Sequence, residues 1–286
     1  MSRGRVPRFL FLLLLVACRE QRVATIHDDL DRPVTLPKHI HRVITIAPNL
    51  TEIVFALGSG DKIAGVDDHS NFPAAAAKLP KVGGMQPNLE KIASLKPDVV
   101  LASSEGNQPA LGPALEAIHI PLYVVRTDRI GEIPAAMERL GALLESPRTQ
   151  AAADAVRKSV DAQRRNRARK PRVLFAVWTD PLYVAGQNTF TNDIFQQCGA
   201  ENVVTADGWP QYSLETFVAH PPDILLYPRG AVTPEQIDAL LARVPSAKPR
   251  VEALDEDVFQ RPGPRVGAAA AALNDILDRW ERETPH

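Results

Sequence analysis

Four aromatic side chains of this 286-residue sequence stand in polar stretches rather than in its apolar runs. They are Trp178, Tyr183, Trp209 and Tyr212, in the segments WTDPLYVAG and ADGWPQY, which we expect to be loops. A core does not need rings in loops, whereas a binding surface gains flat, rigid contact area from them at a small cost in entropy. These residues predict a contact surface for a ligand, although local packing over sheet ends would also explain any single ring.

A second pattern with chemical content is a segment that occurs twice, as LEKIASLKPDVVL and as LETFVAHPPDILL. Asn88 and Ser213 directly precede the two copies and are good N-cap residues, so we expect Glu90 and Glu215 in the first turn of a helix. A carboxylate there offsets the helix dipole by about 0.3–1 kcal/mol and needs no partner. Two exposed carboxylates at equivalent positions would also fit two matching cations on a two-fold symmetric protein. Spacing alone leaves both explanations open.

These residues must be positioned by a regular alternation of strands and helices. Short apolar runs alternate with segments whose apolar residues recur at helical spacing, which is typical of parallel sheets with crossover helices. RVLFAVW mirrors RVITIAP, and TFTNDIFQQCG mirrors LTEIVFALG. Residues 133–169, between the two halves, show a long helical pattern that is broken near Pro147. The expected fold class is α/β, with two Rossmann-like three-layer lobes of mainly parallel sheet joined by one long α-helix.

This organisation divides the chain into five parts. We expect a signal peptide over residues 1–18, an N-terminal arm with a β-hairpin over 19–40, an N-terminal α/β lobe over 41–146, a connecting helix over 147–170 and a C-terminal α/β lobe over 171–286. A stiff helical connector predicts lobes that flex little against each other. The basic run over residues 164–170 is interpreted as a solvated helix end, with a lipid or partner surface as the alternative.

The N-terminus has the pattern of a targeting segment. Three arginines precede the run FLFLLLLVA, which is far shorter than the roughly 20 apolar residues of a membrane-spanning helix. Small residues directly precede Cys18, as in a bacterial lipoprotein signal whose cysteine carries the lipid; an ordinary secretory signal is the alternative. We therefore expect export to the periplasm or cell envelope with a lipid on Cys18. Cys198 is the second of two cysteines, so we expect no internal disulfide and interpret Cys198 as a buried apolar residue.

Charge and motif content exclude several function classes. The formal net charge is −1 at pH 7, so nothing indicates a nucleic-acid partner. The sequence has no G-x-S-x-G elbow, P-loop or dinucleotide-binding glycine fingerprint. Ser103, Ser104 and His69 could be imagined as nucleophile and base, but no ordered third partner accompanies them. We expect a monomeric binding protein rather than an enzyme, with a sensor lipoprotein or a secreted hydrolase as distant alternatives.

Several stretches resemble one known family. RVITIAPNLTEIVFALGSGDKIAGV, FPAAAAKLPKVGG, NLEKIASLKPDVVLAS, RVLFAVWTDPLYVAGQNTF and GAENVVTADGWPQYSLE are similar to periplasmic substrate-binding proteins of the helical-backbone class, most of all to the vitamin B12-binding branch. That family feeds cobalamin, haem or ferric siderophores to ABC importers. The resemblance implies a ligand cleft between the lobes and no cofactor of the protein's own. It also implies that Glu90 and Glu215 meet arginines on the paired permease subunits.

The resemblance further implies which residues line the cleft. A wide planar macrocycle, cobalamin or a related corrinoid, with haem or a ferric siderophore as alternative, fits the aromatic wall. Trp209 is the best single contact, and Asp257 and Arg261 are expected as polar anchors. The ligand-binding residues implied are Pro48, Asn49, His69, Gly84, Trp178, Tyr183, Trp209, Tyr212, Asp257 and Arg261.

The chain departs from the vitamin B12-binding branch in one loop that bears on metal chemistry. Where that branch commonly has YSDYP, this chain has HSNFP. The imidazole of His69 is therefore a candidate axial ligand to the cobalt or iron of a bound macrocycle, because neutral imidazole binds either metal. The alternative is a loop histidine hydrogen-bonded to Asp67 or Asp68.

Two further departures concern the N-terminal wall and a family disulfide. Residues 83–85 and 103–104 stand where some cobalamin binders have tryptophans, so this wall is less aromatic and leaves the ligand's identity open. The family cysteine that would pair with Cys198 is missing, and Asn274 lies near its place in the sequence.

Overall fold

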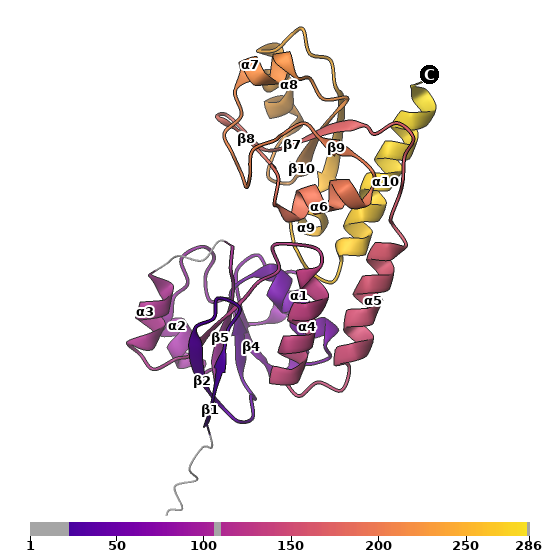
Figure 1. The fold of residues 1–286 in the computed structure, drawn as a ribbon. Coiled ribbons are helices and arrows are strands. Elements are labelled where there is room, and N and C mark those ends of the chain that lie inside the picture. Colours follow the sequence, from indigo (N-terminus) through magenta and orange to yellow (C-terminus); the bar gives the residue numbers. More distant parts are fainter. Residues whose placement is uncertain (1–22, 106–109, 285–286) are drawn as a thin grey trace, which may run out of the picture.

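The computed structural model describes residues 23–105 and 110–284 of the chain. The expected signal peptide and Cys18 therefore lie outside the described residues. Two α/β lobes are arranged one above the other, with the N-terminal lobe at the bottom of Figure 1 and the C-terminal lobe at the top. Within the described ranges, no helix has both the length and the apolar character needed to cross a membrane. The expected two-lobed α/β fold is confirmed.

A β-hairpin precedes the N-terminal lobe, as expected from its alternating residues. Strands β1 (Val23–His27) and β2 (Pro33–Pro37) pair antiparallel. The turn between them is held on the lobe, because the main-chain N–H of Asp29 donates to Val124 O over 3.0 Å. The carboxylate of Asp29 also forms an ion pair with Arg139 at 2.6 Å. The hairpin therefore covers part of one edge of the neighbouring sheet.

The N-terminal lobe is built on a four-stranded parallel sheet in the order β4-β3-β5-β6. Its strands are β3 (Val43–Thr45), β4 (Ile63–Val66), β5 (Val99–Ser103) and β6 (Leu122–Val125). Its helices are α1 (Pro48–Ala56), α2 (Leu89–Ser94), α3 (Leu111–Glu116) and α4 (Glu132–Leu143), with 3₁₀ turns η1 (Gly60–Lys62) and η2 (Ala76–Lys78). Every residue of β5 is buried, because α1 and α4 cover one face of the sheet and α2 and α3 cover the other.

The C-terminal lobe repeats this plan with a five-stranded sheet in the order β11-β10-β7-β8, in which β9 also pairs with β7. Its strands are β7 (Arg172–Thr179), β8 (Leu182–Val184), β9 (Glu201–Asn202), β10 (Ile224–Arg229) and β11 (Arg250–Asp255). Its helices are α6 (Phe190–Gln197), α7 (Leu214–Ala219), α8 (Pro234–Ala242), α9 (Glu256–Phe259) and α10 (Val266–Glu283). All pairings are parallel except that of β7 with β8.

The sequence repeat corresponds to a structural repeat that extends to single hydrogen bonds. In the N-terminal lobe, the carboxylate of Asp98 accepts from the main-chain N–H of Arg42 over 2.8 Å. In the C-terminal lobe, the carboxylate of Asp223 accepts from the main-chain N–H of Arg172, also over 2.8 Å. The Pro-Asp of each copy thus ties the start of a central strand to its neighbour, so the repeated residues organise equivalent ends of the two sheets.

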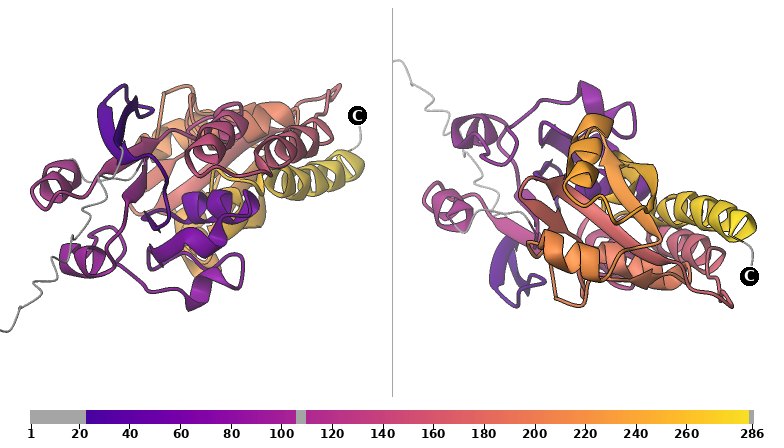
Figure 2. Two further views of the ribbon diagram at one scale, coloured as in Figure 1. Left: turned by 90° about the horizontal axis from the view of Figure 1, so that it is seen from below. Right: turned by 90° about the horizontal axis from the view of Figure 1, so that it is seen from above.

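Helices α5 (Thr149–Asp161) and α10 run along one side of the molecule, and Figure 2 shows them next to each other in both views. They approach closely at Gly267, where a Cβ would lie 2.4 Å from Ser159 Oγ. A larger residue at this position would push the two helices apart. One side of the molecule is therefore closed by tightly packed helices.

The connecting helix is shorter than the sequence predicts. In the basic run that follows it, Arg164, Arg165, Arg169 and Lys170 are exposed as expected, but Arg167 is buried. Helix α5 ends at Asp161, and the side chain of Arg167 is only 4% exposed. Its guanidinium donates to Cys198 O over 3.0 Å and to Asn274 Oδ1 over 3.1 Å, and it pairs with two carboxylates of α10. A buried arginine needs such acceptors. Because they come from α6 and α10, far along the chain, the local helical pattern could not reveal them.

Candidate ligand site between the lobes

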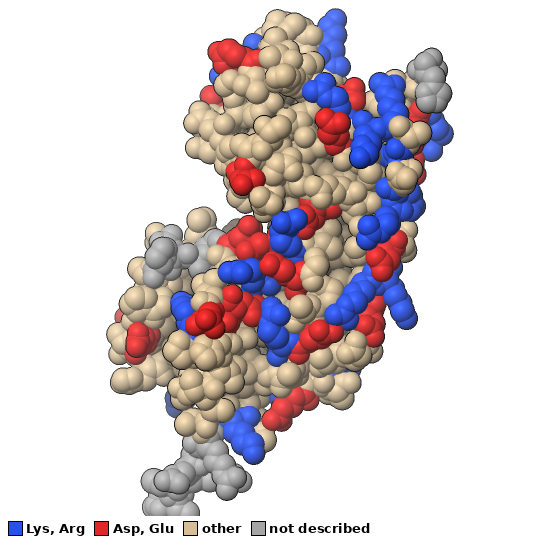
Figure 3. All heavy atoms as spheres, viewed as in Figure 1, with Lys and Arg blue, Asp and Glu red and all other residues tan. Residues whose placement is uncertain are grey.

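A pocket of about 180 Å³ lies at the carboxyl ends of the strands of the N-terminal lobe. Figure 3 shows the molecule hollowed between the two lobes. The pocket is lined by three residues expected at the site, Pro48, His69 and Gly84, together with Met85 and Glu105. Loops that follow parallel strands meet at this edge, which is where ligands bind in open α/β sheets.

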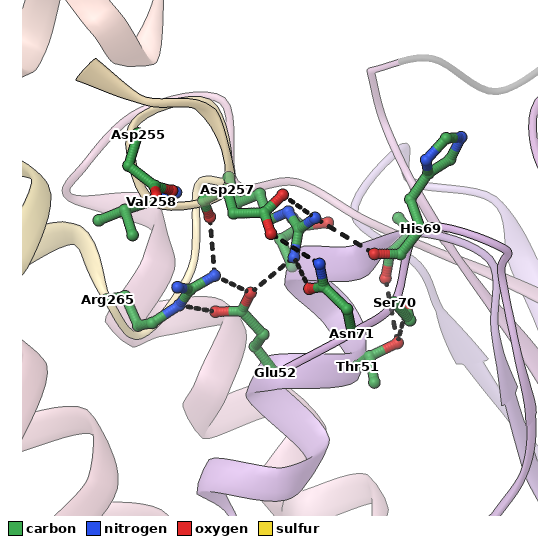
Figure 4. Close-up of polar contacts among 12 residues, drawn as sticks. Thr51, Glu52, His69, Ser70, Asn71, Asp255, Asp257, Val258 and Arg265 are labelled. Carbon is green, nitrogen blue, oxygen red and sulfur yellow. Dashed lines mark hydrogen bonds and ion pairs between the residues drawn. The ribbon is translucent and has the colours of Figure 1, made fainter. Parts of the chain in front are cut away.

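The imidazole of His69 stands in this pocket without a partner among the described residues. The neighbouring carboxylate of Asp67 accepts from the main-chain N–H of His69 over 3.0 Å and from the hydroxyl of Ser70, so it is committed to the backbone of the loop. The ring lies over Gly84, where an added Cβ would be 3.7 Å from His69 Nε2. Figure 4 shows the ring pointing away from the polar cluster at the base of its loop. The geometry leaves a ring nitrogen available to a ligand.

Trp178 and Tyr183 lie on strands, and not on a loop as the sequence analysis expected. They face each other across the antiparallel pair β7 and β8, with only the two-residue turn Asp180-Pro181 between Thr179 and Leu182. Turn-forming residues at its centre gave this segment the composition of a loop. Both rings are exposed, by 47% for Trp178 and 38% for Tyr183. Rings held on paired strands offer a more rigid surface than rings on a loop.

The two remaining aromatic residues differ in their surroundings. Trp209 is 40% exposed, and it lies close enough to Glu105 of the opposite lobe to oppose part of the rise in the pKa of that carboxyl, so it faces the hollow. Tyr212 packs against the core of the C-terminal lobe, and its buried hydroxyl has no hydrogen-bond partner within the described part of the chain. Burial raises the pKa of that hydroxyl. Three of the four rings are thus exposed, and the fourth packs on the core of the C-terminal lobe.

Asn49, Asp257 and Arg261 lie at the junction of the lobes and already have protein partners. The amide of Asn49 is buried and donates to Thr127 Oγ1 over 3.0 Å and across the lobes to Pro262 O over 3.2 Å. The guanidinium of Arg261 pairs with the carboxylate of Asp257. Their groups therefore brace the two lobes in this structure, and their expected contacts with a ligand stay a prediction.

Met85 and Glu105 line the pocket, but sequence reasoning did not select them. Met85 is 74% exposed, which is unusual for so apolar a side chain and suits a contact with a flat ligand. The pKa of the Glu105 carboxyl is raised, first because the surrounding protein displaces solvent and then because Asp128 and Glu132 carry like charge nearby. Their positions after β4 and β5 were visible in the sequence, but the neighbours that give Glu105 its character are distant in the chain.

Glu90 and Glu215 occupy equivalent, exposed positions in the first turns of α2 and α7. As expected, Asn88 caps α2 by accepting from Lys91 N, and Ser213 caps α7 by accepting from Thr216 N. The main-chain N–H of Glu215 itself, and then the Ser213 hydroxyl, lower the pKa of the Glu215 carboxyl. Neither glutamate forms an ion pair with another described residue. In Figure 1 both helices lie on the side away from α5 and α10.

A two-lobed α/β molecule with a hollow between its lobes is the architecture of a substrate-binding protein. The chain belongs to the periplasmic binding protein family, whose model matches residues 43–248. It is 33% identical to the vitamin B12-binding protein of Yersinia pestis (strain Pestoides F) over 249 residues, which are 84% of this chain and 88% of that protein. The family expected from the sequence is therefore confirmed.

Two solved structures share both fold and sequence with this chain. The periplasmic vitamin B12 binding protein BtuF of Vibrio cholerae is 27% identical, with a TM-score of 0.71 over 85% of this chain and 98% of that one. The periplasmic heme-binding protein RhuT from Roseiflexus sp. RS-1 is 26% identical, with a TM-score of 0.74 over 82% of this chain and 97% of that one. These relatives are named as binding proteins, and their ligands differ.

Proposed function

We propose that this protein is the substrate-binding component of an ABC importer that captures a cobalamin-like corrinoid and delivers it to the permease. The observation that carries the proposal is that the two lobes present unlike side chains at the carboxyl ends of their sheets. The C-terminal lobe exposes the rings of Trp178, Tyr183 and Trp209, and the N-terminal lobe offers the unpartnered imidazole of His69. A planar macrocycle with a central metal would use both walls at once.

Charge at the hollow favours a corrinoid over haem. Haem carries two propionate carboxylates, which are best bound by free cations, whereas the corrin ring carries uncharged amides. Arg129 and Arg261 stand at the lobe junction, but both are engaged by aspartates, Asp193 and Asp257. Glu105 instead places a carboxylate in the pocket, where it would repel propionates and accept hydrogen bonds from amides.

Haem is the alternative cargo, because an imidazole is also a common axial ligand of haem iron. The two cargoes differ in the colour of the protein purified from cells that are supplied with both. We expect the visible bands of a corrinoid on the purified protein. A Soret band with no corrinoid bands would overturn the corrinoid assignment and leave the role as a binding protein intact.

Delivery to the permease is proposed to depend on Glu90 and Glu215. Their exposure, their matching helix positions and their location on one side of the molecule suit docking on two equivalent arginine-bearing sites. The lipid on Cys18 would keep the protein at the membrane that holds the permease. Metabolic labelling with a radioactive fatty acid tests this anchor: label should enter the wild-type protein and be absent from Cys18→Ser.

A further inference from the structure

The loop that carries His69 belongs to the N-terminal lobe by sequence, but it is held by both lobes. From its own side, Asp67 fixes the main-chain N–H of His69, and Lys81 Nζ donates to Asp67 O over 3.1 Å. The hydroxyl of Ser70 contacts that of Thr51 over 2.7 Å. These contacts lie on the side of the loop that faces its own sheet and leave the ring untouched.

Residues of the C-terminal lobe contact the other side of the loop. Arg261 Nη2 donates to the main-chain O of His69 over 3.2 Å, and Arg261 Nη1 donates to Asn71 Oδ1 over 2.7 Å. Asn71 Nδ2 in turn donates to Asp257 Oδ2 over 2.6 Å. The guanidinium of Arg265 lies 4.3 Å from the centre of the Phe72 ring. Figure 4 shows this cluster below the free imidazole.

The two arginines that make these contacts, Arg261 and Arg265, have little freedom to move. The side chain of Arg261 is 11% exposed and that of Arg265 is 19% exposed. Both pair with Glu52 of the N-terminal lobe, at 3.4 Å and 2.6 Å, and the side chain of Glu52 is 1% exposed. Removal of one partner would leave a buried charge uncompensated, so the arrangement is strongly favoured over alternatives. The contacts that hold the His69 loop are therefore part of the lobe junction.

We propose that Arg261 and Asp257 are positioning residues for the imidazole of His69. By holding the carbonyl of His69 and the side chain of Asn71, they set the direction in which the ring enters the hollow. Because the holding groups belong to the opposite lobe, the position of the ring depends on how far the lobes are apart. Separation of the lobes, as by a docked permease, would withdraw the ring from a bound metal. This role rests on the proposed function, in which His69 is the axial ligand of the cargo.

Amide hydrogen exchange in the ligand-free protein tests whether Arg261 holds the His69 loop. Arg261→Ala should speed exchange of the amides of residues 69–72 by about tenfold or more, since it removes charge-assisted hydrogen bonds. Arg129→Ala is the matched control, because it breaks an ion pair between the lobes, that of Arg129 with Asp193 at 2.6 Å, and does not touch this loop. Unchanged exchange in Arg261→Ala, or equal acceleration in both variants, would overturn the positioning role.

The visible spectrum of aquocobalamin tests the consequence for the ligand. The ring of His69 would displace the exchangeable water from cobalt, so binding to the wild type should shift the spectrum, and His69→Ala should abolish the shift. Arg261→Ala should reduce the shift and Arg261→Lys should restore part of it, while Arg129→Ala should leave it unchanged. Cyanocobalamin, whose cyanide blocks that position, serves as the control ligand.

The two measurements separate the two claims. A spectral shift in His69→Ala equal to that of the wild type would refute axial ligation, and the exchange data would still decide whether Arg261 holds the loop. If Arg261→Ala does not fold, Asn71→Ala removes the side-chain contacts of Asn71 with Arg261 and Asp257 but keeps the bond from Arg261 to His69 O, so the same changes are expected at a smaller size. Faster exchange with a normal spectral shift would show that the ring finds the metal without positioning, and would also overturn the proposal.

Discussion

The two lobes are alike at the amino ends of their sheets and differ at the carboxyl ends. Asp98 and Asp223 make the same hydrogen bonds at the amino ends. The helices that lead to these two residues also begin alike, with Glu90 and Glu215 in their first turns. At the carboxyl ends, however, one lobe presents an imidazole and a carboxylate, and the other presents exposed aromatic rings. In the proposed function, the shared parts build the fold and carry the two docking carboxylates, while the divergent parts build an asymmetric ligand site.

The largest expected effect is the loss of transport when the glutamates that the two lobes share are removed. Glu90→Ala combined with Glu215→Ala should abolish ligand-dependent stimulation of the importer, because both docking carboxylates are lost. Ligand affinity should stay unchanged, since both residues lie outside the hollow. Importer activity in proteoliposomes and equilibrium titration of the same protein measure the two quantities.

Glu235→Ala is the matched control for this variant. Glu235 is exposed in the first turn of α8, and its pKa is lowered by the same kinds of hydrogen bond as that of Glu215. Transport should be unaffected by this change. A collapse of ligand affinity in the double variant would instead place the two glutamates in the ligand site or in the stability of the fold.

The divergent wall of the C-terminal lobe gives the next largest effect. Trp209→Ala should weaken corrinoid binding by about 2 kcal/mol, roughly 30-fold in Kd, because it removes a central aromatic contact. Trp209→Phe should recover most of the loss, since a flat ring is kept. An unchanged Kd in Trp209→Ala would show that the ligand does not use this wall.

A smaller effect is expected from the carboxylate of the N-terminal wall. Glu105→Gln should strengthen haemin binding by about 1 kcal/mol, the size of one partly screened like-charge contact, and leave cobalamin binding nearly unchanged. In the wild type, haemin binding should strengthen as the pH falls through the raised pKa of Glu105, and this dependence should vanish in the variant. Titration of haemin at several pH values checks both; an identical pH dependence would contradict the assignment.

The raised pKa of Glu105 also makes the stability of the fold depend on pH. A carboxyl whose pKa is raised on folding above its ordinary value of 4.5 favours the folded state below that value and loses this contribution as the pH rises through the folded pKa. Glu105→Gln should therefore show a slightly higher Tm than the wild type at pH 7 and no gain at pH 4. Thermal unfolding at the two pH values measures it.

The smallest effect is expected from Tyr212, which differs from the three exposed aromatic residues in its buried hydroxyl. Tyr212→Phe removes a buried hydroxyl that has no partner among the described residues, so stability should be unchanged or rise by up to about 1 kcal/mol. Ligand affinity should not change. A loss of affinity comparable with that of Trp209→Ala would show that Tyr212 contacts the ligand after all.

Sequence patterns predicted the parts of this molecule that depend on neighbours in the chain. The strand and helix alternation, the hairpin and the helix caps at Asn88 and Ser213 all rest on local periodicity and turn chemistry, and the structure confirms them. The segment around Trp178 was misjudged because Asp180-Pro181 has the composition of a loop, although it is only a tight turn between paired strands.

Contacts between distant residues were out of reach of such patterns. Arg261 meets Asn71 across 190 positions of sequence, and Arg167 meets Asp278 across 111, so neither network leaves a local signal. Glu105 could be placed after a strand, but its raised pKa depends first on burial and then on Asp128 and Glu132, which the fold brings near. The structure brings Pro48, His69 and Gly84 to one pocket and shows that Asn49 and Arg261 brace the lobes, while the contacts of these residues with a ligand stay a prediction.

The central claim is that the hollow between the two unlike walls takes a corrinoid. Isothermal titration of the purified protein with cyanocobalamin and, separately, with haemin tests it most directly. The account predicts saturable binding of one cyanocobalamin per chain and weaker binding of haemin. No heat with cyanocobalamin together with tight haemin binding would contradict it.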